Sequence, residues 1–476
     1  MKEARNLRPA HRVGAAVLLA CAALVGCMPA HRLAPALASI TAPQGWSAPD
    51  SVNAAASQTP VNAQWWQSFG DTMLNQHVET ALAHNTDLLA AGSRLDVARA
   101  QLELSRAALG PTLGATLGVQ TQRALGATGV ATTRLAQPGL QASWEPDLWG
   151  RLHAVVNASD FKLRASQADR DAVALSISST TAQTYIGLLA LEAQLAQTRE
   201  TATSRAEALR IAKDKARVGY TSQLQAAQAE SEYQGVLQSL PQLQAAIARQ
   251  YNALRLLTGE PPSQRDPADA QPGSFALLKL PSVPVALPSE LLRRRPDLAQ
   301  AENLLAASDA SMEASRAAFL PQVSLSASLG ALYINALGYN PASVWSLGGS
   351  VLAPLFDQGR LSAQYDSAAA QRDQAAYAYR GAALAAFGEV ENALVGVGRL
   401  QQQMDHATQR RDILARSLQY AKDRYEAGYA PYLEQLDAQR NLYQTEIELI
   451  NLRQSQLLNQ LSLYKAMGGG WSAALP

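Results

Sequence analysis

The sequence predicts a mainly α-helical protein that carries a membrane-spanning β portion and contains two copies of one structural unit. Three observations predict this fold class: similar residues recur at a displacement of about 210 positions, four short runs alternate between apolar and polar residues, and two runs of 69 residues lack proline. Charged residues make up 17% of the chain, below the roughly 25% of ordinary soluble domains. Much of the surface is therefore expected to be covered.

The N-terminus has the pattern of a bacterial lipoprotein signal. A basic segment and the apolar run 13–24 lead to Leu24-Val25-Gly26-Cys27. A small residue before a cysteine at the end of such a run is what lipoprotein processing requires. The thiol of Cys27 would carry diacylglycerol and its amine an acyl chain such as palmitate. The alternative is an ordinary signal peptide in which Cys27 is incidental.

Processing before Cys27 changes the composition of the mature chain. It removes Cys21, so Cys27 remains the only cysteine and no disulfide is possible. It also takes the formal net charge from +1 to −2, which gives no reason to expect a nucleic-acid partner. Met28 replaces the aspartate that commonly retains lipoproteins at the inner membrane. The expected location is the outer membrane, lipid-anchored and extending into the periplasm.

An internal repeat covers most of the mature chain. The displacement is 210 residues at first and 209 further on, and the register holds over about 170 positions. Copies of this length indicate duplication rather than a solenoid. The matched segments include Ser105-Arg106-Ala107-Ala108 with Ser315-Arg316-Ala317-Ala318, Gly150-Arg151-Leu152 with Gly359-Arg360-Leu361, and Gly219-Tyr220 with Gly428-Tyr429.

Each copy begins with a predicted helix and a predicted β-hairpin. Every second residue is apolar in the strand runs, which is the period of a strand with one apolar face. Alternation alone equally fits a half-buried sheet of a soluble domain. Runs that reach ~9–11 residues, with aromatic residues at their ends, favour membrane-spanning strands. The expected ranges are helices 87–109 and 297–319, β-hairpins 112–146 and 322–356, and hairpin loops 123–134 and 334–343.

The predicted strands require more than one chain. No segment after Cys27 has the ~18 consecutive apolar residues of a membrane-spanning helix, so any spanning must be done by strands. Four strands cannot close a barrel, because the smallest closed membrane barrels have about 8 strands and open edges are not tolerated in lipid. Several chains must therefore share one barrel, and the sequence does not give their number.

A long helical hairpin is predicted after each β-hairpin, over 150–258 and 359–466. The first helix of each would extend roughly 100 Å, at about 1.5 Å per residue. Gly219 and Gly428 suit the position after a helix C-terminus, and start signals for a return helix follow each of them. Pro241 is expected to bend the first return helix or to mark a local break. Alanine-rich helices of this length are expected to line a tube.

Several short motifs follow one another in a constant order from Cys27 to Trp471. In this order the chain resembles the TolC-like outer-membrane factors of bacterial efflux and export systems, and especially the OprM/NodT-type lipoproteins. The resemblance rests on the lipobox, Trp65-Trp66 with Phe69 and Asp71, Leu287-Pro288-Ser289 with Arg294-Arg295-Pro296-Asp297-Leu298, Pro354-Leu355-Phe356 with Gly359-Arg360, Leu436-Asp437-Ala438-Gln439, and Tyr464-Lys465-Ala466-Met467-Gly468-Gly469-Gly470-Trp471.

The resemblance implies a homotrimer whose chains share a twelve-stranded outer-membrane barrel, continued by a twelve-helix periplasmic tunnel. The implied function is the outer-membrane channel of a tripartite efflux pump, a passive exit duct for drugs or other small molecules. Its partners would be a periplasmic adaptor (membrane fusion) protein, an inner-membrane pump of the RND type and outer-membrane lipid. A duct needs neither a metal nor a cofactor, apart from the covalent lipid on Cys27.

These interpretations divide the chain into six parts. The segments outside the two copies are expected to form a belt around the middle of the tunnel. The parts are a signal peptide (1–26), an anchor and equatorial segment (27–85), the first copy (86–258), an equatorial linker (259–296), the second copy (297–466) and a C-terminal tail (467–476).

The resemblance also places a periplasmic gate at the turn of the second helical hairpin. The acidic and aromatic residues that constrict the tunnel in the family map onto Tyr425, Glu434 and Asp437. The turn residues Gly219, Tyr220, Gly428 and Tyr429 would form the tips. Ala430 departs from the family pattern, because some relatives have a charged residue there that ties the closed state to a neighbour.

The predicted acidic residues belong to the second copy alone. Their equivalents in the first copy are Gln225 and Gln228. The alternative interpretation is local, because acidic residues in the first turns of a helix are stabilised by the helix dipole by ~0.3–1 kcal/mol. That alternative explains the acidity of the second copy but not its absence from the first.

An enzyme is not expected. The six histidines show no ligand spacing, no phosphate-binding lysine follows a glycine run, and Gly396-Val397-Gly398 lacks a third glycine. The rival function is a structural or adaptor lipoprotein whose coiled-coil hairpins bridge envelope components without forming a pore. The sequence does not name the cargo, because a tunnel of serine, glutamine, threonine and alanine selects little.

Overall fold

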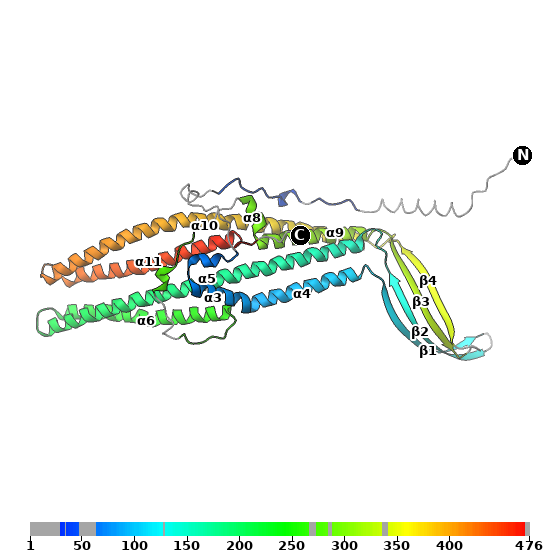
Figure 1. Cartoon of the computed structure of the whole chain (residues 1–476), viewed down its shortest axis with the longest axis horizontal. Coiled ribbons are helices and arrows are strands. Elements are labelled where there is room, and N and C mark those ends of the chain that lie inside the picture. Colours follow the sequence, from blue (N-terminus) through cyan, green and yellow to red (C-terminus); the bar gives the residue numbers. More distant parts are fainter. Residues whose placement is uncertain are drawn as a thin grey trace. The chain divides into compact units, whose positions relative to one another are not determined.

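The computed structural model describes residues 29–33, 35–46, 63–126, 129–265, 273–283, 288–335 and 341–471 (Figure 1). Cys27 and the predicted signal peptide lie outside the described residues. The chain separates into two compact units, which are described one at a time. The first unit combines Met1–Ser39, Arg94–Gln167 and Gln300–Gly381, and the second combines Ile40–Ser93, Ala168–Ala299 and Ala382–Pro476.

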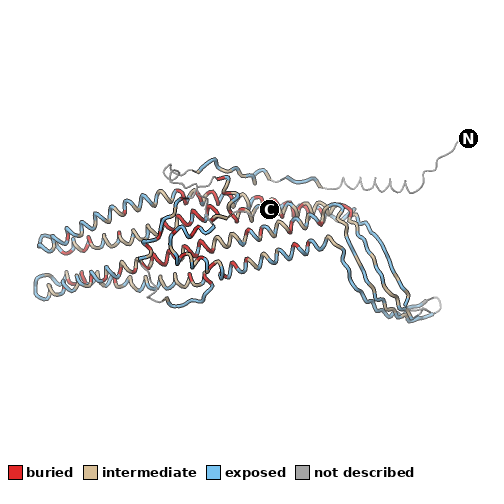
Figure 2. Tube along the Cα trace, in the orientation of Figure 1, coloured by how far each residue is buried: buried red, intermediate tan, exposed pale blue. Residues whose placement is uncertain are grey.

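The first unit contains a four-stranded antiparallel sheet in the order β1-β2-β3-β4. The register places apolar residues opposite one another on one face, for example Leu140 opposite Leu329 and Leu329 opposite Trp345. These three residues are exposed in the single chain. The tube of the sheet is coloured mostly as exposed (Figure 2). The strands are β1 (Thr112–Gly126), β2 (Gly129–Trp144), β3 (Gln322–Ile334) and β4 (Ala342–Leu352).

The first β-hairpin is longer than its sequence pattern predicts. The expected loop over 123–134 is wrong, because β1 continues to Gly126 and β2 begins at Gly129. The apolar alternation ends near Val119, yet the backbone ladder continues and pairs Thr121 with Arg134. Backbone hydrogen bonds do not depend on side-chain polarity, so a strand extends beyond the apolar part of its own pattern.

The helices follow the predicted order, and the two halves of the chain have matching lengths. The helix before each β-hairpin has 22 residues, the long helix after it 67, and the return helix 35. In the described part of the chain, no helix has an apolar stretch long enough to cross a membrane. The helices are α4 (Thr86–Ala107), α5 (Arg151–Arg217) and α6 (Gln223–Leu257), then α9 (Pro296–Ala317), α10 (Arg360–Glu426) and α11 (Tyr432–Ala466).

Pro241 lies inside α6 without interrupting it, so the expected break does not occur. Proline lacks the N–H that would bond the carbonyl of Leu237. Pro241 lies on the exposed side of the helix, where a freed carbonyl can bond to solvent. The helix therefore tolerates the residue.

Aromatic residues from the N-terminal segment form the core of the second unit. The short helix η2 (Trp65–Phe69) inserts Trp65 and Phe69 between α5 and α11, where Trp65 stacks on Tyr464 at 6.0 Å between ring centroids. Asp71 caps the next helix by accepting a hydrogen bond from the Leu74 amide at 2.8 Å. The remaining helices are η1 (Ala36–Ala38), α3 (Thr72–His84), α7 (Ser274–Leu277) and α8 (Pro288–Arg294).

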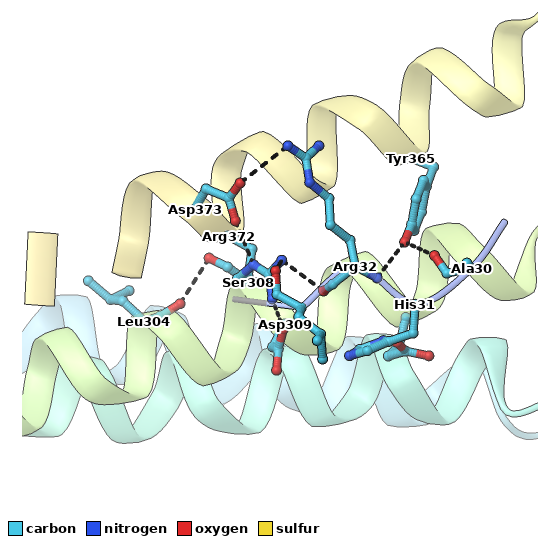
Figure 3. Close-up of polar contacts among 11 residues, drawn as sticks. Ala30, His31, Arg32, Leu304, Ser308, Asp309, Tyr365, Arg372 and Asp373 are labelled. Carbon is cyan, nitrogen blue, oxygen red and sulfur yellow. Dashed lines mark hydrogen bonds and ion pairs between the residues drawn. The ribbon is translucent and has the colours of Figure 1, made fainter. Parts of the chain in front are cut away.

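The chain just after the predicted lipidation site lies along α9 and α10 of the first unit (Figure 3). The Tyr365 hydroxyl donates to the carbonyl of Ala30 at 2.8 Å, and the buried Arg372 guanidinium donates to the carbonyls of Arg32 and Leu33, each at 2.9 Å. The expected anchor and belt segment is therefore divided. Its beginning, up to Ser39, belongs to the first unit and the rest to the second.

Candidate functional site

The ends of the two helical hairpins, in the second unit, contain the predicted gate residues. Each long helix ends at a left-handed glycine, Gly219 at φ +80° and Gly428 at φ +82°. The amide of the next residue returns to the helix, from Tyr220 to the Lys215 carbonyl at 2.9 Å and from Tyr429 to that of Arg424 at 2.8 Å. This bonding satisfies carbonyls that a helix end leaves free. Both tyrosine side chains are exposed.

Polar contacts hold the two hairpins together within one chain. Thr198 of α5 and Tyr443 of α11 share a hydrogen bond of 3.0 Å between their hydroxyls. Nearby, the side-chain amide of Gln197 donates a hydrogen bond to the Glu446 carboxylate at 2.9 Å. The α5 and α11 helices therefore lie side by side, and this contact joins the first hairpin to the second.

Tyr425 packs between the hairpins, close to the tips. Its ring lies 5.3 Å from that of Tyr432, and the Lys215 ammonium lies 5.2 Å from its ring centroid. Ala212 of α5 and Leu436 of α11 belong to the same apolar cluster. Burial raises the pKa of Tyr425 above its ordinary value, so the phenol stays neutral in the periplasm. The ring therefore fills space between the first and second hairpins.

Glu434 and Asp437 are exposed in the single chain. Glu434 lies in the first turn of α11, with a carboxylate oxygen 3.6 Å from a nitrogen of Arg424. Asp437 accepts a hydrogen bond of 3.2 Å from Arg440. Among the described residues, no hydrogen bond, ion pair or ring contact joins Tyr425, Glu434 and Asp437 to one another. The structure brings all three to the same end of α10 and α11.

A buried ion-pair network lies next to the predicted gate residues. The Arg205 guanidinium of α5 donates to one Glu232 oxygen at 2.5 Å, and its side chain is only 5% exposed. Arg440 of α11 donates through Nε and Nη2 to the other Glu232 oxygen, and through Nη1 to Asp437. This Arg205–Glu232–Arg440 network ties both helices of the first hairpin to the second hairpin.

The electrostatics of the network favour its charged form. Burial raises the pKa of Glu232, but the hydrogen bond from Arg440 and the charge of Arg205 outweigh burial, so the pKa lies below its ordinary value. The hydrogen bond from Glu232 likewise raises the pKa of Arg440. Glu232 is therefore ionised at neutral pH and accepts from two guanidinium groups.

The sequence analysis missed this network, although a signal was present. Arg205 stands 14 residues before Gly219 and Glu232 stands 13 residues after it. In an antiparallel hairpin, positions at equal distances from the turn lie opposite each other. Opposite charges at such positions predict an ion pair from the sequence alone.

The described residues contain no group of three or more histidine, cysteine, aspartate or glutamate side chains that could hold a metal ion. The residues at the tips interact through charge and through side-chain packing. An ion pair, an aromatic pair and two exposed carboxylates suit a movable contact between helices.

The fold is that of the TolC-like outer-membrane channels. The family model described as outer membrane efflux protein matches residues 77–260 and 287–469. Because this covers more than half of the chain, the chain belongs to the outer membrane efflux protein family and is an outer-membrane protein. The two matched segments correspond to the two halves of the fold.

Particular relatives narrow the comparison. The chain is 34% identical over 419 residues to the pyoverdine export outer membrane protein OpmQ of Pseudomonas aeruginosa. This match covers 86% of this chain and 88% of OpmQ. The chain is 33% identical over 419 residues to the toluene efflux pump outer membrane protein TtgC of Pseudomonas putida, with 86% and 85% covered. The structure of the outer-membrane channel OprN matches with a TM-score of 0.83 at 27% identity, over 92% of this chain and 99% of OprN.

Proposed function

We propose that this protein is the outer-membrane channel of a tripartite efflux pump and serves as a passive exit duct. The observation that carries the proposal is the sheet of the first unit. Its apolar face is exposed in the single chain, with Leu117 at 71% and Leu347 at 78% exposure. Within the described sheet, β1 and β4 each pair with one neighbour only. An apolar face with two open edges suits a larger closed sheet in lipid.

Three chains are the proposed number. Each contributes four strands, so a homotrimer would form one twelve-stranded barrel continued by twelve periplasmic helices. The equal element lengths of the two halves support the view that each chain contains two copies of one unit. Three such chains would give the helical part six similar helical hairpins around one axis, a pseudo-sixfold arrangement. Neighbouring hairpins would then make similar contacts all around the tube.

Lipidation at Cys27 is the proposed anchor. The chain emerging after Cys27 is held by Tyr365 and Arg372, so acyl chains at that point would tie the first unit to the membrane. Lipid adds about 0.8 kcal/mol per buried CH₂. No other cofactor is proposed, and no catalytic role.

The pump would supply the energy and choose the cargo. OpmQ is named for pyoverdine export and TtgC for toluene efflux, and these cargoes differ widely in size and polarity. A similar duct in both cases supports selection by an inner-membrane transporter, which would deliver cargo through a periplasmic adaptor. The exposed tip residues Tyr220 and Tyr429 offer the adaptor a contact surface.

The tips are the proposed gate. In the closed state Tyr425 would fill the space between hairpins, and the Arg205–Glu232–Arg440 network would hold the second hairpin against the first. Glu434 and Asp437, repeated three times around the axis, would repel one another even at an effective dielectric of ~20. Divalent cations would relieve that repulsion and block the pore.

Planar-bilayer conductance of the purified protein tests the proposal, together with detergent-resistant trimers that dissociate on heating. Leu329→Arg places a charge on the apolar face and should cost about 2–4 kcal/mol near the bilayer centre, which prevents assembly. Ser328→Arg is the matched control on the opposite face and should alter conductance alone. A non-conducting wild type would instead favour a structural adaptor lipoprotein, and equal loss of assembly in both variants would indicate a soluble sheet.

A further inference from the structure

The four strands contain two charged residues, and both are arginines on the apolar face. No aspartate or glutamate occurs in β1 to β4, and the two cations are Arg123 in β1 and Arg134 in β2. Because side chains alternate between faces, Arg123 shares a face with Leu117 and Val119. Arg134 is paired with Thr121, two residues from Arg123, and therefore lies on that same face.

The two arginines lie diagonally across the β1–β2 ladder. Arg123 is opposite Thr132, and Arg134 is the next residue of β2 on that face. Diagonal neighbours of this kind are about 7–8 Å apart, within reach of long side chains. Two like charges so placed repel each other, unless an anion lies between them.

Neither guanidinium has a partner among the residues that the structure describes. Arg123 and Arg134 are exposed, and neither side chain forms a hydrogen bond or an ion pair with another described residue. Outside the β1–β2 ladder, the backbone of Arg134 also bonds to Asn335. A hollow of about 330 Å³ adjoins this level of the sheet, lined by residues that include Val119, Thr121, Arg134, Tyr333 and Asn335. The site is therefore open to a ligand of negative charge.

The height of the arginines corresponds to the edge of a bilayer. Arg123 stands ten positions along β1 from Leu113, which is about 33 Å of strand at roughly 3.3 Å per residue. At a tilt of about 40° this rise is roughly 25 Å, the usual height of the apolar band of a membrane barrel. Tyr333 lies opposite Ala136, one step below Arg134 on the same face, as an interfacial aromatic residue would.

We propose that Arg123 and Arg134 together bind the phosphate of an anionic lipid headgroup in the outer leaflet, one site per chain. The proposal rests on the membrane barrel of the proposed function. Planar guanidinium groups bind phosphate through paired hydrogen bonds. The long aliphatic stem of an arginine can lie along an apolar sheet face while its charged head reaches the interface. A lipid fits better than free phosphate, because its acyl chains pack on Val119 and Leu117 below the headgroup.

Native mass spectrometry of the purified channel, titrated with diphosphorylated lipid A, tests the site. Arg123→Gln with Arg134→Gln should weaken binding about tenfold, the usual effect of losing hydrogen bonds to a charged group. The matched control exchanges neighbours between faces: Gln122→Arg with Arg123→Gln, and Thr133→Arg with Arg134→Thr. It keeps composition, charge and height, and should bind as weakly as the double glutamine variant.

Three results would overturn the proposal. Equal affinity of the wild type and the double glutamine variant would remove the arginines from lipid binding. Full affinity in the face-exchanged control would show attraction by net charge alone. Displacement of the lipid by inorganic phosphate, with equal affinity for both, would identify a free anion as the occupant.

Conductance in bilayers of uncharged phosphatidylcholine separates this site from the pore. The double glutamine variant should conduct as the wild type does, because its changes lie on the apolar face of the sheet and not on the lumen face. A wild type that conducts, with lipid binding unaffected by the substitutions, rejects the lipid site and keeps the channel. A wild type that does not conduct rejects the channel itself.

Discussion

The two helical hairpins have the same backbone and different chemistry at their tips. The α5 and α10 helices each have 67 residues, α6 and α11 each have 35, and the turn glycines differ by 2° in φ. The side chains do not follow this symmetry. The second hairpin has Tyr425, Glu434 and Asp437 where the first has Ala216, Gln225 and Gln228, and the first has Arg205 and Glu232 where the second has Leu414 and Asn441.

The side chains that differ between the two hairpins are those that join them. Glu232 of the first hairpin receives hydrogen bonds from Arg440 of the second, and Tyr425 of the second packs beside Ala212 of the first. Identical hairpins would place identical residues face to face, and like charges repel. Because the two hairpins differ at these positions, opposite charges meet, and the contact between hairpins depends on these differences.

Removing the buried cation should have the largest effect. Arg205→Leu gives the first hairpin the leucine that the second hairpin has at the equivalent position, Leu414. It leaves the half-buried Glu232 with Arg440 as its only cationic partner. The free energy of unfolding should fall by about 3 kcal/mol, because a buried charge loses a partner. Denaturant unfolding followed by circular dichroism measures it. Arg205→Leu with Glu232→Asn should recover most of the loss, and Arg210→Leu, at an exposed site, should change nothing measurable.

If the double variant were no more stable than Arg205→Leu, the loss would come from packing of the arginine stem rather than from the unpaired carboxylate. The network would then be a packing feature, and the charge difference between hairpins would lose its role.

Acid should weaken the same network. The folded-state pKa of Glu232 lies below its ordinary value of 4.5, so the stabilisation is fully present above that value. It is lost as the pH falls through the lower, folded-state pKa. The difference in unfolding free energy between wild type and Glu232→Gln should therefore be constant at neutral pH and shrink below about pH 4.5. A difference independent of pH would contradict the ionised pair.

Much of this molecule could be predicted from the sequence because helices and repeats have long-range patterns. The bounds of α5 and α10 were predicted within one residue, since proline and glycine mark their ends. The outer part of β1 was missed because its residues beyond Val119 have no apolar alternation. There the strand is maintained by backbone pairing with β2, which side-chain patterns do not reveal.

The candidate site likewise has a part that the sequence predicted and a part that it did not. Tyr425, Glu434 and Asp437 were assigned through a resemblance, and their role as a gate stays a prediction. Arg205 was overlooked because a single arginine in an alanine-rich helix has the pattern of an ordinary exposed cation. Its burial depends on α11, which lies more than 200 residues further along the chain. Local periodicity contains no information on such a contact.

Shortening the aromatic side chain of the second hairpin should open the tips. Tyr425→Ala gives the second hairpin the residue of the first, Ala216, and removes the pair with Tyr432. Such pairs contribute about 0.5–1.5 kcal/mol beyond area burial, so the open population should rise up to about tenfold. Resting conductance in planar bilayers measures it. Tyr420→Ala, at an exposed position of α10, should leave conductance unchanged, and a rise in both variants would deny Tyr425 a specific role.

Neutralising the exposed acids should change ion block with little effect on stability. Glu434→Gln with Asp437→Gln copies the glutamines of the first hairpin. The two ion pairs with Arg424 and Arg440 are exposed, so unfolding should change by less than about 1 kcal/mol. Block by divalent cations from the periplasmic side should disappear in bilayer recordings. Persistent block would leave helix-dipole stabilisation as the reason for the acids, and Asp405→Asn, further from the tip on α10, serves as the control.

The smallest expected difference concerns the turns themselves, where the hairpins should behave alike. Gly219→Ala and Gly428→Ala each place a side chain on a left-handed backbone, which costs about 1–2 kcal/mol. An added Cβ meets open space at both positions, so backbone conformation alone sets each cost. The two variants should therefore agree within about 0.5 kcal/mol in denaturant unfolding. A clearly larger loss at Gly428 would contradict this expectation and would mean that the second turn is also constrained by contacts outside the single chain.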